Sequence, residues 1–230
     1  MLISEFLKSL TRSKRKVIFN DLKTTKPVSR FFGIERGTPI DRRYIEFFLQ
    51  KNSHLIKGRV LEVGEAVYSK KFAGGEVTSF EVFHTVPENK AATIIGDLTD
   101  PATLPENFAD CFICTQTFNF IFEVHKAIVG AHRLLKPDGT LLATVAGISQ
   151  ISRYDMERWG DYWRFTTASI NRLFVPVFGD SLQVETYGNV LASTAFLQGV
   201  AVEDLPDETL LDEKDPDYQM LITIIARKAS

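Results

Sequence analysis

From residue 58 onward, short apolar strands alternate with helical segments, and this order constrains the fold more than any other feature of the chain. The first strand lies in residues 58–68, Gly-Arg-Val-Leu-Glu-Val-Gly-Glu-Ala-Val-Tyr, and is followed by a glycine turn. An open parallel sheet binds its ligand at the carboxyl ends of its strands. Glycine there lets backbone N–H groups approach a ligand that a Cβ would hold away. The stretch therefore predicts a ligand site directly after the first strand.

Seven strands are expected, several of them continuous apolar runs, as in a sheet that helices cover on both faces. They span residues 59–63, 77–82, 93–95, 111–115, 140–145, 182–187 and 220–227. Helices are expected at 125–135, 167–175 and 191–200, and an earlier one with Thr38 as its N-cap and Pro39 at its first position. This alternation predicts an α/β protein with a mostly parallel sheet and right-handed crossovers.

Composition restricts the class of protein. A chain of 230 residues with 44% apolar side chains fits one domain with a large core. A net charge of −2 argues against a general nucleic-acid binder, although residues 1–36 hold nine Lys/Arg against three Asp/Glu. This basic segment predicts either a solvated helix face or contact with an anionic partner, such as a membrane surface or phosphorylated substrate. Five of its cations are Lys8, Arg12, Lys14, Arg15 and Lys16.

Neither a membrane span nor a metal site is expected. No apolar run reaches the roughly 20 residues that a spanning helix needs, and Glu5, Lys8 and Arg12 interrupt any signal-peptide core. A cytoplasmic protein is therefore expected. Cys111 and Cys114 lie three apart in an expected buried strand, so their side chains point to opposite faces. They predict core packing rather than a disulfide or a shared metal.

Several stretches within residues 36–228 together resemble the class I S-adenosylmethionine-dependent methyltransferases. Residues 60–64 resemble the family's first-strand motif, 108–116 its fourth strand, and 132–142 the helix-turn-strand that follows. The resemblance implies a seven-stranded Rossmann-like sheet, mostly parallel with the last strand antiparallel, and S-adenosylmethionine as cofactor. It divides the chain into a basic, helical N-terminal extension at 1–50 and a methyltransferase domain at 51–230.

The resemblance also implies which residues hold the cofactor. Glu81 would accept both ribose hydroxyls, Asp97 with Leu98 would bind the adenine amino group, and Glu62 would attract the ammonium group. Further implied contacts are Gly64, Ala66, Thr115 and Gln116. Two of these residues have structural alternatives. Glu62 can cap neighbouring backbone N–H groups, and Asp97 can form an Asx turn.

The glycine loop departs from the family pattern. The family usually has glycine at alternate positions after the first strand, but here Gly64 is followed by Glu65, Ala66 and, at the third glycine place, Tyr68. The histidine that often follows the family's fourth strand is also missing from residues 117–120. No catalytic base is therefore implied. The chain's own candidates, each with a structural alternative, are His84, His125, Asp155 and Asp161.

Residues 151–165 follow the fifth strand, so they begin at the carboxyl edge and are expected to bind the methyl acceptor. The expected contacts are Arg153, Asp155, Trp159, Asp161 and Tyr162, whereas Trp163 and Phe165 are expected to anchor the segment to the sheet. Aromatic faces beside charged groups suit a sugar ring. Residues 36–42 and 159–166 more narrowly resemble bacterial methyltransferases associated with polysaccharide and glycan biosynthesis.

The expected activity is thus O-methylation of a glycan, a sugar or another small hydroxylated metabolite. No nucleic-acid partner is expected, and the basic N-terminus allows peripheral contact with a membrane. The alternative is a non-catalytic or repurposed protein of the same fold, which the altered glycine loop favours. A nucleotide-binding enzyme of another class, such as a short-chain oxidoreductase, is disfavoured because the chain lacks G-x-G-x-x-G.

Overall fold

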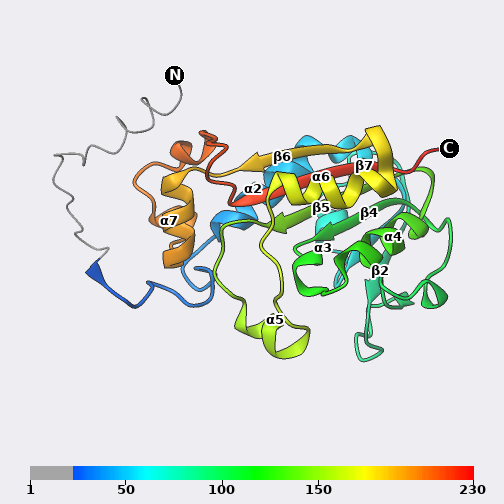
Figure 1. The fold of residues 1–230 in the computed structure, drawn as a ribbon, viewed down its shortest axis with the longest axis horizontal. Coiled ribbons are helices and arrows are strands. Elements are labelled where there is room, and N and C mark those ends of the chain that lie inside the picture. The colour runs from blue at the N-terminus through cyan, green and yellow to red at the C-terminus, as the bar shows by residue number, and fades with distance from the viewer. Residues whose placement is uncertain (1–22) are drawn as a thin grey trace, which may run out of the picture.

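Helices cover both faces of a seven-stranded sheet in the computed structural model, which describes residues 23–230 (Figure 1). The strands are β1 Gly58–Val63, β2 Val77–His84, β3 Ile94–Ile95, β4 Ala109–Thr115, β5 Leu135–Ala146, β6 Gln183–Tyr187 and β7 Leu221–Arg227. The helices of six or more residues are α2 Ile40–Lys51, α3 Val67–Phe72, α4 Val124–Leu134, α5 Arg153–Arg158, α6 Thr167–Phe178 and α7 Val190–Gln198.

The sheet has the strand order β3-β2-β1-β4-β5-β7-β6. Strands β1 to β5 pair in parallel, and β7 runs antiparallel to both β5 and β6. The predicted Rossmann-like methyltransferase sheet is therefore confirmed. Strand β5 begins earlier than expected because Leu135 already pairs with Ala109, before the chain loops out and Thr140 pairs with Cys111. The parallel strands bring their carboxyl ends to one edge, which is where a ligand site is expected.

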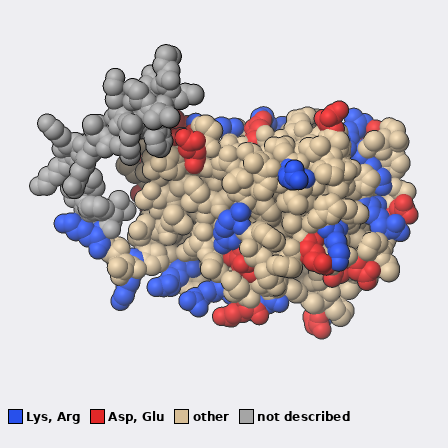
Figure 2. All heavy atoms as spheres, in the orientation of Figure 1, with Lys and Arg blue, Asp and Glu red and all other residues tan. Residues whose placement is uncertain are grey.

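Two hydrophobic cores lie on opposite faces of the sheet. One packs α4 and α6 against it and includes Cys114, and the other packs α2, α3 and α7 against it and includes Cys111. Both thiols are fully buried, and burial raises the pKa of Cys114 to about 12. The prediction that the two cysteines pack in the core is confirmed. On the face that Figure 2 shows, most charged side chains lie toward the outer edge of the molecule.

Helix α2 differs from the expectation at its start. Its N-cap is Pro39, not Thr38, because the backbone N–H and hydroxyl of Thr38 donate to the carboxylate of Glu203. The boundary expected at residue 50 falls in the last turn of α2, whose buried face packs in the same core as the sheet. The basic residues between Lys8 and Lys16 lie outside the described residues.

Candidate cofactor and acceptor site

A cavity of about 630 Å³ opens at the carboxyl ends of β1, β2 and β4, within the size range of small-molecule sites. Seven of the residues that the sequence predicted for cofactor or acceptor binding line it together. They are Gly64, Asp97, Leu98, Gln116, Asp155, Trp159 and Tyr162. We call this space the donor cavity, because it holds the predicted cofactor residues.

Gly64 occupies a backbone conformation that requires glycine. Its φ is 84°, and no described residue has an atom within 4 Å of the place a Cβ would take. The peptide is held on both sides, since its N–H donates to the carbonyl of Phe83 at 2.9 Å and its carbonyl accepts from the amide of Asn89 at 2.8 Å. The turn is therefore fixed with open space beside the glycine, as close approach of a ligand requires.

The residues beside Gly64 leave the cavity open. The carboxylate of Glu62 accepts from the backbone N–H groups of Tyr68 at 3.0 Å and Ser69 at 2.7 Å, which is the capping alternative. Burial raises the pKa of Glu62, and the hydrogen bonds from Ser69 oppose that rise. Glu65 is exposed to solvent, Ala66 precedes α3, and Tyr68 packs against the core on the α2 side. The altered loop therefore takes its bulky side chains away from the donor cavity.

Glu81 lies within β2 rather than at its end. It pairs with Leu61, and its carboxylate is 3.9 Å from the Nε atom of Arg59. Strand β2 runs on to His84, which lines the donor cavity, whereas Glu81 does not. The Nδ1 atom of His84 accepts from the N–H of Val86 at 3.1 Å. The strand end that faces the cavity is thus a histidine.

Asp97 forms the Asx turn and also lines the donor cavity. Its Oδ1 atom accepts from the N–H and the hydroxyl of Thr99 at 2.7 and 2.8 Å, which forms the Asx turn. The residue also lines the donor cavity, next to the buried side chain of Leu98. Since one carboxylate oxygen serves the turn, the other is the one available to a ligand.

We expect Asp97→Ala to weaken the affinity for S-adenosylhomocysteine by roughly 10- to 150-fold, as loss of a hydrogen bond to a charged group does. Glu81→Ala should change it less than about threefold, because Glu81 lies outside the cavity and its 3.9 Å ion pair with Arg59 is long. Calorimetric titration measures both. Asp100→Ala is the matched control, since Asp100 caps the N–H of Ala102 in the same loop and lines neither cavity. If Glu81→Ala lost more affinity than Asp97→Ala, Glu81 would be the residue that binds the ribose.

The end of β4 carries a strained residue that faces the cavity. Gln116 has a φ of 49°, which costs a non-glycine residue roughly 1–3 kcal/mol. Its backbone N–H donates to the carbonyl of Thr144 at 2.8 Å, and its side-chain carbonyl accepts from Asn119 at 3.1 Å. Thr115 lines neither cavity and instead accepts through its carbonyl from the hydroxyl of Thr117. The fold thus holds Gln116 in a strained geometry at the site.

A second cavity, of about 140 Å³, adjoins the first, because Gln116, Phe120 and Asp155 line both. We call it the side cavity. Most of its lining residues are polar, and those not shared are Phe32, Asp41, Asn119, Ala146, Ser149, Gln150, Ser152, Asp161 and Arg164. The side cavity therefore offers carboxylate, amide and hydroxyl groups next to the donor cavity.

The carboxylates of the side cavity differ in their surroundings. Asp161, with 1% of its side chain exposed, forms a two-pronged ion pair with Arg164 and accepts from the N–H of Ser152 at 2.9 Å. Asp155 accepts from the hydroxyl of Ser152 at 2.6 Å. Asp41 accepts only from the neighbouring N–H of Arg42 among the described residues, and burial raises its pKa to about 6. Asp161 therefore fixes the local structure, whereas Asp41 is a cavity-lining carboxylate with a raised pKa.

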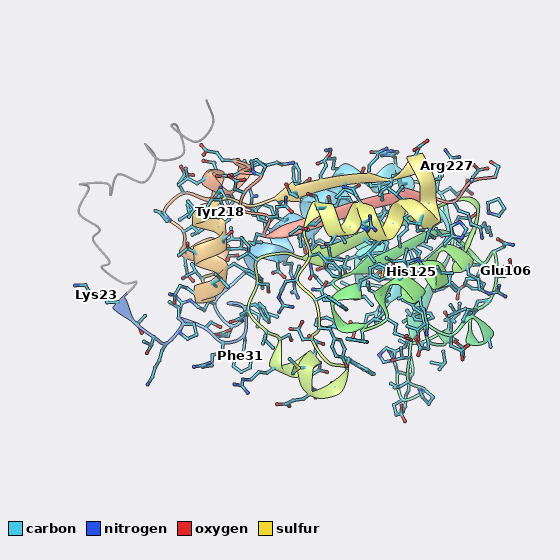
Figure 3. The ribbon with its side chains drawn as sticks, viewed as in Figure 1. Lys23, Phe31, Glu106, His125, Tyr218 and Arg227 are labelled. Carbon is cyan, nitrogen blue, oxygen red and sulfur yellow. The ribbon has the colours of Figure 1, made fainter. Side chains whose placement is uncertain are left out.

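Two candidate residues lie away from both cavities. His125 is exposed on α4 (Figure 3), and Arg153 is exposed at the start of α5. The anchoring role of Trp163 and Phe165 is confirmed. The indole N–H of Trp163 donates to the carbonyl of Ile121 at 3.0 Å, its ring stacks on Phe122, and Phe165 is buried in the core.

Sequence reasoning missed part of the lining. Phe120 and Phe122 come from the run Phe-Asn-Phe-Ile-Phe at 118–122, and this run of alternating aromatic residues directly after a buried strand was the available signal. Asp41 suits the first turn of a helix as an acidic residue, and this pattern gives no sign of a cavity. Phe32 precedes any regular element, so no sequence pattern places it at the side cavity.

The strand order and the helices on both faces are those of the Rossmann-like methyltransferase fold. A family model described as a methyltransferase domain matches residues 64–143, from the glycine turn into β5. No curated protein matches the sequence. The matched methyltransferase domain and the strand order together support the expected methyltransferase fold.

Solved structures share this fold at low sequence identity. An S-adenosylmethionine-dependent methyltransferase from Archaeoglobus fulgidus has a TM-score of 0.51 and 10% identity over 81% of this chain and 94% of its own. Phosphoethanolamine N-methyltransferase 2 of Haemonchus contortus, in complex with S-adenosylhomocysteine, has a TM-score of 0.52 and 13% identity. The match covers 82% of this chain and 53% of that one. The [4+2]-cyclase SpnF has a TM-score of 0.53 and 15% identity, over 84% of each chain. None of these three carries a link to polysaccharide or glycan biosynthesis.

Proposed function

We propose that this protein transfers the methyl group of S-adenosylmethionine to a hydroxyl group of a sugar, glycan or other small hydroxylated acceptor. The observation that supports this most is the side cavity. It adjoins the donor cavity through Gln116, Phe120 and Asp155, and its polar wall suits an acceptor with several hydroxyl groups.

The residues of the donor cavity fit the cofactor. The backbone of Gly64 allows close approach, Asp97 offers a carboxylate oxygen, and Gln116 is held at the end of β4. S-adenosylmethionine supplies a methyl group activated by a sulfonium. Trp159 and Tyr162, from the segment that includes α5, line the same cavity, and the Trp159 ring lies 6.1 Å from that of His84. These contacts support a role for Trp159 beside the donor rather than the acceptor, where its ring helps to exclude water.

The side cavity has the groups that a hydroxyl acceptor needs. The amides of Gln116, Asn119 and Gln150 can hydrogen-bond hydroxyls, and the rings of Phe32 and Phe120 can face the apolar side of a sugar ring. Attack by the hydroxyl oxygen requires removal of its proton. A carboxylate whose pKa is about 6 is ionised at neutral pH and more basic than an ordinary one, so Asp41 takes that role. Asp155 lies where the two cavities meet and orients the acceptor.

We expect methyl glycosides or other polyhydroxylated compounds, offered with S-adenosylmethionine, to yield S-adenosylhomocysteine and a methyl ether by mass spectrometry. Asp155→Asn should lower this turnover about 100-fold, as loss of a positioned group at the reacting centre does. Its affinity for S-adenosylhomocysteine should stay within about threefold of the unmodified protein. Glu157→Gln is the control, because Glu157 is exposed on the same helix and lines neither cavity. Methylation of amines but of no hydroxyl compound would contradict the proposal.

A repurposed protein of the same fold is the second candidate. Glu65 and Tyr68 replace the family's usual loop residues, and the similar fold of SpnF belongs to a cyclase. In that case the protein would bind S-adenosylmethionine without forming S-adenosylhomocysteine with any acceptor. Binding by calorimetry together with no product across the acceptor panel would favour this candidate.

A further inference from the structure

Residues 23–34, which we call the strap, include a firmly held section. The N–H of Ser29 donates to the carbonyl of Gln198 at 3.0 Å, at the end of α7. The hydroxyl oxygen of Ser29 accepts from the N–H groups of Phe31 and Gly33. The ring of Phe32 lies 5.6 Å from that of Phe196. The strap backbone is thus fixed around Ser29, so the outward direction of its exposed side chains is a feature of the fold.

The strap nevertheless exposes large apolar side chains. Phe31 is 69% exposed, and Val28 and Ile34 are each 54% exposed. These residues recur every three positions, and Ser29 and Phe32, which face inward, lie between them. Figure 3 shows Phe31 at the lower edge of the molecule, on the same edge as α5. Exposed apolar side chains that gather at one place mark an interaction site.

The segment that leads into α5 extends this surface. The amide of Gln150 donates to the carbonyl of Arg30 at 3.4 Å and joins the segment to the strap. Ile151 is 56% exposed and Tyr154 is 65% exposed. We call the five exposed side chains of the two segments the apolar rim. They are Val28, Phe31, Ile34, Ile151 and Tyr154.

Cations surround the apolar rim. The strap has three, at Lys23, Lys26 and Arg30, and no Asp or Glu, and α5 adds Arg153 and Arg158. The guanidinium of Arg158 lies 3.5 Å from the centre of the Tyr154 ring. The exposed carboxylates that border the rim are Glu35 and Glu157. The rim is therefore apolar and positively charged at once.

The chain's acidic stretch, residues 203–217, bonds both to the start of α7 and to residues 36–44, which follow the strap. Asn189, at the start of α7, donates to the carbonyls of Leu210 and Glu213, whereas the strap bonds to Gln198 at its end. Where the stretch does reach residues that follow the strap, Asp204 pairs with Arg36 at 2.7 Å. Lys and Arg side chains gather along the lower left of Figure 2, where the strap leaves the fold. The acidic stretch thus pairs with residues after the strap, and the cations of the strap itself stay on the side of the apolar rim.

We infer that the apolar rim docks on an anionic membrane surface. Phe, Ile and Val side chains held outward by a fixed backbone can enter the headgroup layer, while flanking lysines and arginines contact lipid phosphates. A protein partner would need acidic groups opposite the same cations, and the membrane supplies both the apolar and the anionic component. Phe32 and Gln150, which belong to the two segments of the rim, also line the side cavity. Docking therefore brings the side cavity to the membrane interface.

The test is cosedimentation of the full chain with large vesicles of phosphatidylcholine alone or with 30% phosphatidylglycerol, at low and at high salt. We expect at least about tenfold stronger binding to the anionic vesicles and loss of binding at high salt, because the Debye length shortens. Lys26→Glu with Arg30→Glu should reduce binding at least about 20-fold, since each cation near an anionic surface adds about fivefold. Phe31→Ser with Ile34→Ser should reduce it about tenfold or more, because burial of apolar area drives interfacial binding.

Matched controls separate the rim from the rest of the surface. Lys57→Glu with Lys70→Glu reverses exposed charges elsewhere, and Val175→Ser with Val190→Ser removes side chains that are 46% and 55% exposed on α6 and α7. Both controls should bind the vesicles as the unmodified protein does. Equal binding to the neutral vesicles, no binding to either kind, or equal losses in the rim variants and the controls would each overturn the inference.

Discussion

Gly64→Leu should abolish useful cofactor binding while the protein still folds. The leucine side chain would fill the space beside residue 64 and hold a ligand away from the turn between β1 and α3. We expect the affinity for S-adenosylhomocysteine to fall at least about 100-fold, which is about 2.8 kcal/mol. The φ of 84° adds backbone strain of roughly 1–3 kcal/mol to the cost in folding stability. Calorimetric titration and urea unfolding measure the two effects separately.

Gly179→Leu separates cavity filling from strain. Gly179 follows α6 with a φ of 61°, also has no described atom within 4 Å of a Cβ, and lines neither cavity. The Gly179→Leu variant should lose folding stability by a similar amount and keep its affinity for S-adenosylhomocysteine. If both variants lost affinity equally, the effect at Gly64 would come from destabilisation. Gly64 would then not be the residue that the cofactor approaches.

The sheet was predictable because its pattern is local and repeated. Each strand is a short apolar run bounded by polar residues, and the order of strands and helices determines which strands are parallel. Cys111 and Cys114 are an example, since a spacing of three in a strand fixes opposite faces whatever the register. The end of β2 was harder. Nothing in the amino-acid sequence shows that the strand continues past Glu81 to His84, because Phe83 and His84 suit a strand and a loop equally.

The site was predicted where it depends on strand ends and missed where it depends on tertiary contacts. Gly64, Asp97 and Gln116 follow β1, β3 and β4, so the parallel sheet brings them to one edge. Asp41 reaches the same region from the start of α2, more than 70 residues before Gln116. No periodicity links these positions. The packing of α2 against the sheet, which places Asp41 at the side cavity, is a property of the folded core.

Asp41→Asn should remove activity and stabilise the fold at the same time. Asparagine cannot take the acceptor's proton, so we expect turnover of a hydroxylated acceptor to fall by about 10²–10⁴. In the unmodified protein turnover should rise as the pH passes through about 6, where Asp41 ionises, and then level off. The variant should lack that rise. Initial rates from pH 5 to 8, with S-adenosylhomocysteine affinity measured in parallel, test both statements.

The stability change follows from the same raised pKa. In the unfolded chain an aspartate ionises near its ordinary value of 3.8, but in the fold Asp41 holds its proton until about pH 6. The folded state thus binds more protons between these values, so stability falls as the pH rises from about 4 to about 6 and stays lower above that. Asparagine avoids this cost, and we expect Asp41→Asn to gain about 1–2 kcal/mol at pH 7.5 and little at pH 4. Urea unfolding at both pH values measures the gain, and Asp180→Asn, at an exposed aspartate that lines neither cavity, is the control. A variant that is no more stable at pH 7.5, and whose activity still rises through pH 6, would show that another group is the base.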